Sequence, residues 1–159
     1  MQSNCLDTVI SGKKQKQIPC RNSLKRRNNR KERVMANHNH QKKIALINDY
    51  TGFGRCSVAV QLPIISMLKV QCCALPTSIF SDHTGFESFF YTDYTDNMQA
   101  YIEEWKKLQL HFKGICTGFL GSAQQIQIVS QFIRDFKKED TITVIDPVMG
   151  DYGKAYPTY

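Results

Sequence analysis

The stretch that decides the fold runs from residue 142 to residue 151 and reads ITVIDPVMGD. Its apolar, β-branched start predicts a buried strand that delivers a carboxylate, Asp146, to the strand's carboxyl end. Pro147 and Gly150 then break the strand pattern and place a second carboxylate, Asp151, a few residues later. Ligands of open α/β sheets bind beyond the carboxyl ends of the strands, where Mg²⁺ shares oxygen ligands with substrate phosphates. The stretch fits such a magnesium–phosphate site, and it fits equally well a strand followed by a solvated turn.

Upstream of this stretch the chain alternates between helix and strand patterns. Apolar residues recur at helical spacing in three segments, 57–69, 96–108 and 123–137. Short apolar runs predict four strands, at 44–47, 70–75, 112–117 and 141–146. Residues 51–54 are expected to form a glycine-containing turn and residues 79–85 a polar loop. This alternation predicts an α/β fold with a mostly parallel sheet that helices cover on both faces.

The positive charge of the chain belongs to its first 43 residues. The whole sequence carries 21 Lys and Arg against 14 Asp and Glu, a net charge of +7. Residues 1–43 hold 12 of those basic residues and 2 of the acidic ones, which leaves 9 and 12 for the remainder. The globular part is therefore mildly acidic. Its charge does not support nucleic-acid binding, and we expect neither a nucleic-acid nor a membrane partner.

Residues 1–43 show no periodicity and are predicted to be a disordered basic leader. Three interpretations stay open. A nucleic-acid-binding arm would be basic, but no aromatic residues interleave to stack on bases. An organellar presequence would be rich in Arg and poor in acids, but a clear apolar face is missing. In the third interpretation translation starts at Met35, because the codons of Lys31 and Glu32 can spell a purine-rich ribosome-binding sequence.

The cysteines form no CxxC pair and show no zinc-type spacing; they are Cys5, Cys20, Cys56, Cys72, Cys73 and Cys116. Cys72 and Cys73 lie in an apolar run, where cysteine usually serves as a small buried hydrophobic residue. The sequence shows no secretory signal and no apolar run of membrane-spanning length. We therefore expect reduced thiols in a cytoplasmic protein.

Polar and glycine-rich segments follow three of the predicted strands: 48–54, 117–119 and 146–151. The carboxyl ends of parallel strands meet at one edge of a sheet, so these segments are expected to form one site. The Gly52-Phe53-Gly54 turn lacks the pattern of a P-loop and the third glycine of a dinucleotide fingerprint, so a turn that simply starts a helix is favoured. His83 fits either a ligand contact or a residue that caps its loop.

Four motifs in order give the sequence a family resemblance: NDYTGFGRCS at 48–57, SDHTGF at 81–86, TGFLGS at 117–122 and DPVMGD at 146–151. Residues 44–159 resemble the N-terminal part of a pyridoxal/pyridoxamine kinase of the ribokinase-like superfamily. The resemblance implies a three-layer α/β/α fold and ATP- and Mg²⁺-dependent phosphorylation of the 5′-hydroxymethyl group of pyridoxal, pyridoxamine or pyridoxine. Related hydroxymethylpyrimidine kinases share the DPVM segment, so a pyrimidine is the alternative substrate. The His-Thr-Gly loop favours the B6 vitamers.

On the substrate side the resemblance assigns roles to single residues. Asp49 stands where the family places a residue near the pyridine ring nitrogen, a position that is Ser in many members. A carboxylate there would pair better with a protonated ring nitrogen. His83, Thr84 and Gly85 match the loop that contacts the substrate. Phe119 stands where many members have Tyr, which keeps the ring and loses a hydroxyl.

On the nucleotide side the resemblance implies Asp146 and Asp151 at the ATP phosphates and Mg²⁺, with Tyr156 as a further contact. Family members continue for roughly as many residues again and carry there a Gly-Thr-Gly-Asp-type motif with the base that activates the substrate hydroxyl. We therefore expect the base to lie beyond Tyr159 and this chain alone to be a very poor catalyst. The competing interpretation is a non-catalytic remnant that binds a vitamer or a partner subunit. A complete enzyme is expected to be a homodimer.

Overall fold

The structure is a computed structural model, and it describes residues 41–151 and 153–155, with the side chain of Asp151 left out. The predicted leader lies outside this part except for its last three residues. The start proposed at Met35 and the nucleotide contact predicted at Tyr156 lie outside it too.

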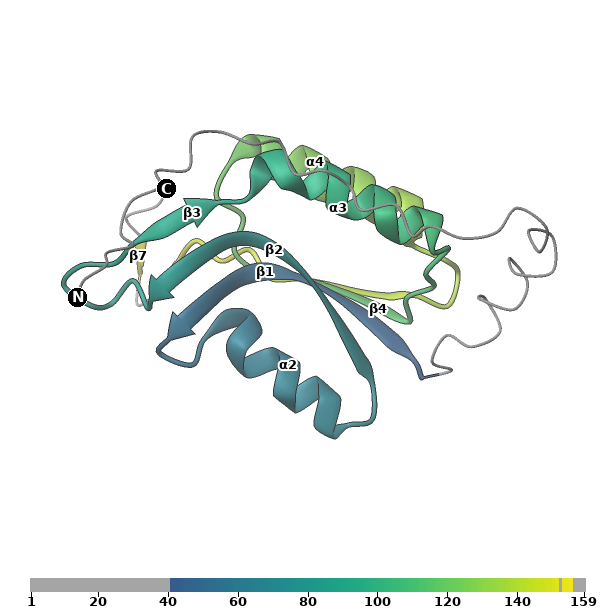
Figure 1. Cartoon of the computed structure of the whole chain (residues 1–159), viewed down its shortest axis with the longest axis horizontal. Helices are drawn as coiled ribbons and strands as arrows, with labels where there is room; N and C mark the ends of the chain where they lie inside the picture. Colours follow the sequence, from purple (N-terminus) through teal and green to yellow (C-terminus); the bar gives the residue numbers. More distant parts are fainter. Residues whose placement is uncertain (1–40, 152, 156–159) are drawn as a thin grey trace, which may run out of the picture. The chain divides into compact units, whose positions relative to one another are not determined.

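A single sheet of five strands organises the described residues, in the order β3-β2-β1-β4-β5 (Figure 1). Four of its strands run parallel: β1 (Lys43–Phe53), β2 (Gln71–Asp82), β4 (Gly114–Thr117) and β5 (Ile142–Ile145). The edge strand β3 (Tyr91–Asp93) pairs antiparallel with β2. A small hairpin of β6 (Gly150–Asp151) and β7 (Lys154–Ala155) follows β5. The predicted α/β class with a mostly parallel sheet is confirmed.

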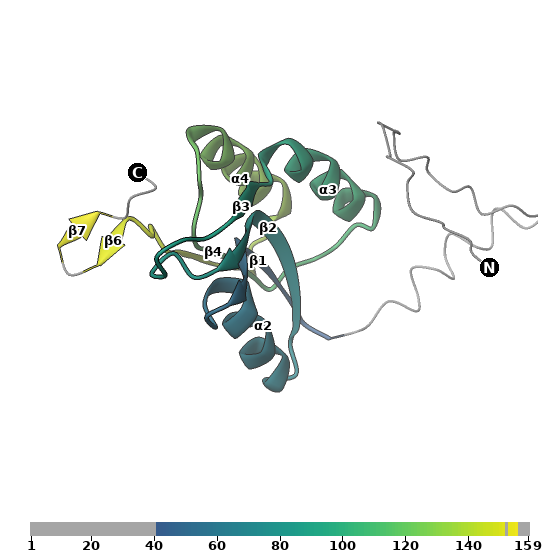
Figure 2. The same cartoon turned by 60° about the vertical axis from the view of Figure 1, so that its left-hand side comes forward.

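Helices cover both faces of the sheet, which makes three layers (Figures 1 and 2). Helix α2 (Ser57–Met67) packs on one face against β1 and β2. Helices α3 (Thr95–Lys107) and α4 (Ala123–Phe136) lie side by side on the other face. All three predicted helices are confirmed, with their ends within two residues of the predicted ones. Among the described residues, no helix has the length and apolar character that crossing a membrane requires.

The main core lies between the sheet and the pair α3 and α4. It joins alternate strand residues, which point to the same face, with the inner faces of the two helices. Its buried members are Ala45, Ile47, Leu75, Met98, Ile102, Phe112, Ile115, Val129, Phe132 and Phe136. The aromatic rings interlock: the Phe132 and Phe136 ring centroids lie 4.5 Å apart, and Phe112 contacts both rings. This burial of apolar area stabilises the domain.

Strands β1 and β2 are longer than predicted. The turn expected at 51–54 and the loop expected at 79–85 are wrong over residues 51–53 and 79–82, which are strand. The two segments pair in parallel as far as Phe53 and Asp82, with a register shift between Asn48 and Tyr50. Polar composition suggested a loop, but pairing with neighbouring strands decides strand structure more than intrinsic preference does. The result is a two-stranded extension of the sheet, to which β3 adds beside residues 78–80 of β2.

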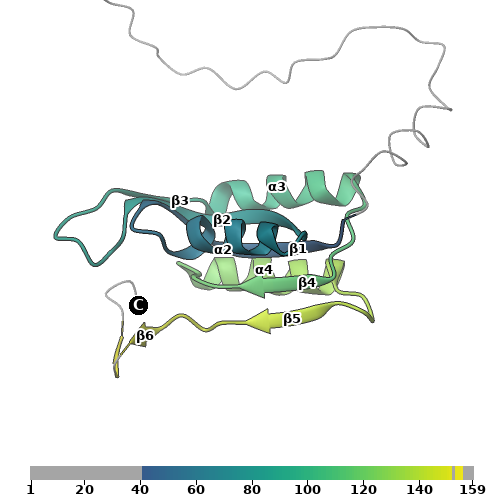
Figure 3. The same cartoon turned by 90° about the horizontal axis from the view of Figure 1, so that it is seen from below.

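Strand β5 forms the other edge of the sheet (Figure 3). Its apolar side chains are largely exposed, with 71% of the surface of Ile142 and 64% of that of Ile145 accessible. Helix α2 lies over β1 and β2, so the described residues leave the α2 side of β5 uncovered. An apolar strand edge of this kind is a place where a further strand can pair.

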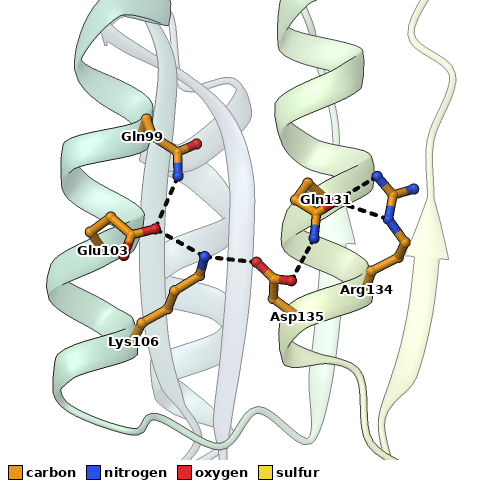
Figure 4. Close-up of polar contacts among 6 residues, drawn as sticks. All are labelled: Gln99, Glu103, Lys106, Gln131, Arg134 and Asp135. Atoms are coloured by element: carbon orange, nitrogen blue, oxygen red, sulfur yellow. Dashed lines mark hydrogen bonds and ion pairs between the residues drawn. The ribbon is translucent and has the colours of Figure 1, made fainter.

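A network of charged and amide side chains joins α3 to α4 (Figure 4). The Nζ of Lys106 on α3 lies 2.8 Å from Oδ2 of Asp135 on α4 and 2.9 Å from Oε1 of Glu103. The amide of Gln131 donates to the other oxygen of Asp135 at 2.6 Å. The hydrogen bond from Lys106, and next that from Gln131, hold the pKa of Asp135 below its usual value. The two helices are thus tied at the surface as well as through the core.

We predict that Lys106→Met lowers the melting temperature by about 2–4 °C, because it removes the cation that links the two helices. Lys107→Met is the matched control, since the salt bridge of Lys107, with Glu104, lies within α3. Thermal unfolding followed by circular dichroism measures both. The difference between the variants should shrink in 1 M salt because salt screens surface charges. Equal melting temperatures of the two variants at low salt would contradict the link.

Candidate functional site

The candidate site lies where β1 loses one of its two neighbours. Strand β1 pairs with β4 only as far as Ile47, opposite Thr117, and then continues beside β2. At this level the N–H of Gly118 donates to the carbonyl of Ile47 at 2.8 Å. The N–H of Asp146 donates to the carbonyl of Thr117 at 3.3 Å. The segments that follow β4 and β5 therefore lie side by side, and the segment after β4 is the one next to the middle of β1.

Asn48 organises this junction, and sequence reasoning assigned it no role. Its side chain is buried, and its Oδ1 accepts the N–H of Phe119 at 2.8 Å and that of Asp49 at 3.0 Å. Its Nδ2 donates to Oε1 of Gln61 on α2 at 3.2 Å. One carboxamide thus connects β1, α2 and the loop after β4. It supplies a partner for a backbone N–H just where the sheet no longer does.

Asp49 follows directly and is a buried carboxylate, with 6% of its surface exposed. Its Oδ2 accepts a hydrogen bond of 2.8 Å from the hydroxyl of Thr51, which is itself buried. A buried charge is costly unless it has hydrogen-bonding or charged partners. A carboxylate held in this position can bind a cationic or N–H-bearing group of a ligand at low additional cost.

Gly118, the first glycine of the TGFLGS motif, is needed for close packing. A Cβ on Gly118 would overlap the carboxamide of Asn48, closer than real carbon contacts come. Gly121, three residues on, is different: a Cβ there would meet the ring of Phe119 at an ordinary 3.5 Å. Gly118 therefore lets the loop approach β1, and this approach brings Phe119 to Asn48.

Phe119 packs into a group of aromatic rings on the strand extension. Its ring meets that of Phe80 edge to face, with centroids 5.9 Å apart. Phe80 in turn stacks on Tyr91 at 5.3 Å and contacts Phe89 at 5.8 Å. Flat rings at these separations offer faces and edges on which another aromatic ring can pack. Sequence reasoning missed Phe80, because the predicted loop at 79–85 concealed its place in a strand.

The predicted substrate loop, His83 to Gly85, lies at the far end of the strand extension. The N–H of His83 donates to the carbonyl of Phe53 at 2.9 Å, and its Nδ1 accepts the N–H of Gly85 at 3.0 Å. A neutral ring that accepts through Nδ1 carries its proton on Nε2. Gly54, with a φ of 117°, makes room, since a Cβ there would lie 2.7 Å from Cβ of His83. In this structure His83 caps its own loop.

This loop and Asp49 do not meet. Asp49 lies four residues before Phe53, and at about 3.3 Å per strand residue that separation is about 13 Å. His83 and the exposed Thr84 and Gly85 lie beyond the last strand pair, Phe53 with Asp82. The structure thus brings Asp49 and Phe119 together through Asn48 and leaves the His83 loop apart from them.

On the predicted nucleotide side, Asp146 is exposed directly after β5, and its carbonyl accepts the N–H of Val148 at 3.0 Å. Asp151 lies in β6, and Tyr156 is outside the described residues. No group of three or more His, Cys, Asp or Glu side chains close enough to hold a metal occurs in the described part of the chain. Asp146 still fits Mg²⁺ bound in the usual way, by one or two carboxylates together with substrate phosphates.

Four cysteines fall among the described residues, and all four are free thiols. Burial, followed by the neighbouring Cys73 and Cys116, raises the pKa of Cys72 to about 11. Burial also raises the pKa of Cys73, and burial with the charge of Asp146 raises that of Cys116. The three thiols are therefore protonated at neutral pH and are poor nucleophiles. Cys5 and Cys20 lie outside the described residues.

No protein-family model matches the sequence. Among solved structures, a protein of Bacteroides thetaiotaomicron named as a phosphomethylpyrimidine kinase is 48% identical with a TM-score of 0.74, over 77% of this chain and 42% of that one. An orthorhombic crystal form named in the same way, with pyridoxal, matches at 49% identity and a TM-score of 0.73, over 75% and 42%. Pyridoxal kinase from Lactobacillus plantarum is 26% identical with a TM-score of 0.68, over 74% and 42%.

Pyridoxal kinase from Leishmania donovani in complex with ADP and pyridoxamine is 17% identical with a TM-score of 0.69, over 73% of this chain and 43% of that one. At this identity the likeness shows the fold alone. The chain spans less than half the length of each of these structures.

We predict that Gly118→Ala lowers the free energy of unfolding by about 1–3 kcal/mol, because the added methyl group must push aside a packed carboxamide. Gly121→Ala is the matched control in the same loop, where the added methyl meets only an ordinary contact. Urea unfolding measures both variants. A Gly118→Ala protein as stable as Gly121→Ala would show that the loop does not approach β1 as described.

We predict that Cys72 reacts with iodoacetamide at pH 8 about 100-fold more slowly in the folded chain than in the chain unfolded in urea. The pKa of this thiol rises from 9.0 to about 11 in the folded chain. At pH 8 its reactive thiolate fraction is therefore about 100-fold smaller than that of an ordinary cysteine. Mass spectrometry of the tryptic peptides follows the labelling of each cysteine. Equal rates in the folded and unfolded chains would contradict the burial of this thiol.

Proposed function

Because the chain is related to the pyridoxal and phosphomethylpyrimidine kinases of the ribokinase-like superfamily, we propose that it provides the substrate-binding part of an ATP-dependent pyridoxal kinase. In the proposed reaction the oxygen of the 5′-hydroxymethyl group of a B6 vitamer attacks the γ-phosphorus of ATP. The bond from that phosphorus to ADP breaks, and the hydroxyl proton passes to a base. We propose that this base lies in a Gly-Thr-Gly-Asp-type motif beyond Tyr159, as the family resemblance implies.

The observation that carries the proposal is the buried carboxylate of Asp49 beside the Phe119 loop. A pyridine ring nitrogen is basic, and a carboxylate that faces it favours its protonated form, as enzymes that use pyridoxal phosphate arrange for their cofactor. The rings of Phe119 and Phe80 supply aromatic surface on which the flat pyridine ring can pack. The 49% identical Bacteroides structure with pyridoxal supports the same substrate class.

On the nucleotide side we propose that Asp146 and Asp151, with Tyr156, face the phosphates of ATP, and that the two carboxylates hold Mg²⁺. When bound, Mg²⁺ would neutralise charge on the phosphates during transfer. Asp146 is exposed directly beyond the strand end that neighbours the Thr117 loop, which suits a phosphate brought next to the substrate. We further propose that His83, Thr84 and Gly85 reach the substrate only when their loop moves toward Asp49, since His83 is bonded to Phe53, about 13 Å along β1 from Asp49.

A hydroxymethylpyrimidine is the second candidate substrate, because the 48% identical protein is named as a phosphomethylpyrimidine kinase. The two ligands share a hydroxymethyl group on a flat nitrogen heterocycle. They differ in the ring nitrogen that the carboxylate of Asp49 would contact. A protein that binds a vitamer without catalysis is the alternative from another class, and the 42% share of the related structures that this chain spans is compatible with it.

We predict that the chain binds pyridoxal and that Asp49→Asn weakens this binding by about ten- to a hundred-fold, the loss expected for a charge-assisted hydrogen bond. Titration followed by the absorbance of pyridoxal measures the affinity. Asp140→Asn is the matched control: Asp140 is an exposed carboxylate at the opposite end of the sheet, bonded to His111 and Lys113. If hydroxymethylpyrimidine displaces pyridoxal and binds more tightly, the pyrimidine becomes the first candidate substrate and pyridoxal the second.

We predict that the chain alone converts no measurable pyridoxal to pyridoxal 5′-phosphate with Mg²⁺ and ATP, and that a chimera with the remaining part of the Bacteroides protein does. In the chimera, Asp146→Ala should raise the KM for Mg²⁺–ATP about tenfold or more and leave the Kd for pyridoxal unchanged. Product formation is followed by mass spectrometry. Equal loss of nucleotide and pyridoxal binding in Asp146→Ala would contradict the nucleotide-side role of this carboxylate.

A further inference from the structure

Three buried polar side chains from three elements converge on the loop between β4 and α4, residues 118–122. They are Asn48 of β1, Thr77 of β2 and Gln125 of α4, with 6%, 0% and 0% of their surfaces exposed. Polar groups buried this deeply are costly unless every one of them is hydrogen-bonded. Sequence reasoning gave none of the three a role, because each is an ordinary polar residue whose partners lie far away in the sequence.

The backbone of Phe119 is held from both sides. Its N–H donates to Oδ1 of Asn48 at 2.8 Å, and its carbonyl accepts the hydroxyl hydrogen of Thr77, also at 2.8 Å. The first bond joins residues 71 positions apart and the second joins residues 42 apart. Because the backbone N–H and the carbonyl of Phe119 are both hydrogen-bonded, the direction in which its side chain leaves the backbone is fixed. The ring then meets Phe80 of β2 at 5.9 Å.

Gln125 ties the same loop to the strand. Its Nε2 donates to the carbonyl of Thr77 and to the hydroxyl of Thr95, each at 2.8 Å, and its Oε1 accepts the N–H of Gly121 at 2.8 Å. Its own N–H donates to the hydroxyl of Ser122, which caps α4, at 3.2 Å. Both hydrogens of the carboxamide and its oxygen are in use. These bonds therefore join the start of α4, the loop and the middle of β2.

We propose that Asn48, Thr77 and Gln125 are positioning residues that hold Phe119 beside Asp49 so that the two form one site for the ring of the substrate. This inference rests on the proposed function, since it assigns to Phe119 and Asp49 a shared ligand. Both bonds act on the backbone of Phe119. Oδ1 of Asn48 accepts the N–H of Phe119 together with that of Asp49, and the hydroxyl of Thr77 donates to the carbonyl of Phe119. Loosening either side lets the ring of Phe119 turn away from the ligand and weakens binding.

The test compares two threonines that are chemically matched. The hydroxyl of Thr77 donates to the carbonyl of Phe119 at 2.8 Å, and that of Thr141, at the opposite end of the sheet, donates to the carbonyl of Phe112 at 2.8 Å. Both threonines are buried, so Thr77→Val and Thr141→Val each remove one buried hydroxyl and conserve the shape of the side chain. The Kd for pyridoxal of the full 159-residue chain is measured together with the urea midpoint.

We expect Thr77→Val to raise the Kd for pyridoxal about tenfold and Thr141→Val to leave it within twofold of the wild type. Both should lower the urea midpoint, Thr141→Val by at least as much, because its hydroxyl also accepts the N–H of Lys138 at 3.0 Å. Thr77→Ser, which restores a hydroxyl, should recover most of the affinity. Equal effects of the two valine variants on the Kd would overturn the proposal and leave Thr77 a purely structural residue. So would a Thr77→Val chain that binds pyridoxal as tightly as the wild type.

A second measurement separates this inference from the proposed function. Amide hydrogen exchange of Phe119 and Gly121, followed by NMR, reports on the loop without any ligand. We expect exchange at Phe119 to be about tenfold faster in Thr77→Val and unchanged in Thr141→Val, and exchange at Gly121 to be about tenfold faster in Gln125→Met. If the wild-type chain binds no pyridoxal, the proposed function fails. Unchanged exchange in Thr77→Val and Gln125→Met overturns the positioning network itself.

Discussion

The change from two neighbours to one along β1 shapes the rest of this structure. From Ile44 to Ile47 the strand pairs with β2 on one side and β4 on the other, and Ala45, Leu46 and Ile47 are fully buried. From Asn48 onward only β2 continues beside it. Where β4 no longer pairs with β1, backbone groups still need partners, and the carboxamide of Asn48 accepts the N–H of Asp49 and that of Phe119. The polar residues of the candidate site are therefore, first of all, a consequence of the sheet's geometry.

The sequence was sufficient for the class of fold, because helices and buried strands differ in the period of their apolar residues. It was insufficient for the strand extension, since Thr77 and Ser78 look like loop residues until their partners are known. Both are fully buried in β2. Asp49, Phe119 and Asp146 could be predicted as site residues from local motifs and the family resemblance that these motifs carry. Asn48 and Gln125 could not, because their roles come from contacts with residues tens of positions away, which no local pattern encodes.

The two faces of the sheet are covered unequally, and this bears on what the described part of the chain can do. The α3 and α4 side has a closed aromatic core, reinforced at the surface by Lys106 and Asp135. On the other side, α2 covers β1 and β2. Val144 pairs with Cys116, whose side chain alternation places on the α2 side, and 53% of the surface of Val144 is accessible. In the described residues the folded core is thus adjacent to the proposed substrate side, and the strand beside the proposed nucleotide side is the least covered.

In the proposed function this asymmetry would separate binding from catalysis. Asp49 and Phe119 are attached to the best-packed strands through hydrogen bonds of about 2.8–3.0 Å, so a ring-binding surface needs little reorganisation to receive a ligand. Phosphoryl transfer instead depends on placing the nucleotide, the metal and the acceptor within bonding range at the same moment. Asp146 follows an edge strand with exposed side chains, where such placement is hardest to hold. In the proposed kinase, the part that β1 organises would recognise the substrate, while the rate of transfer would depend on how firmly the β5 side is held.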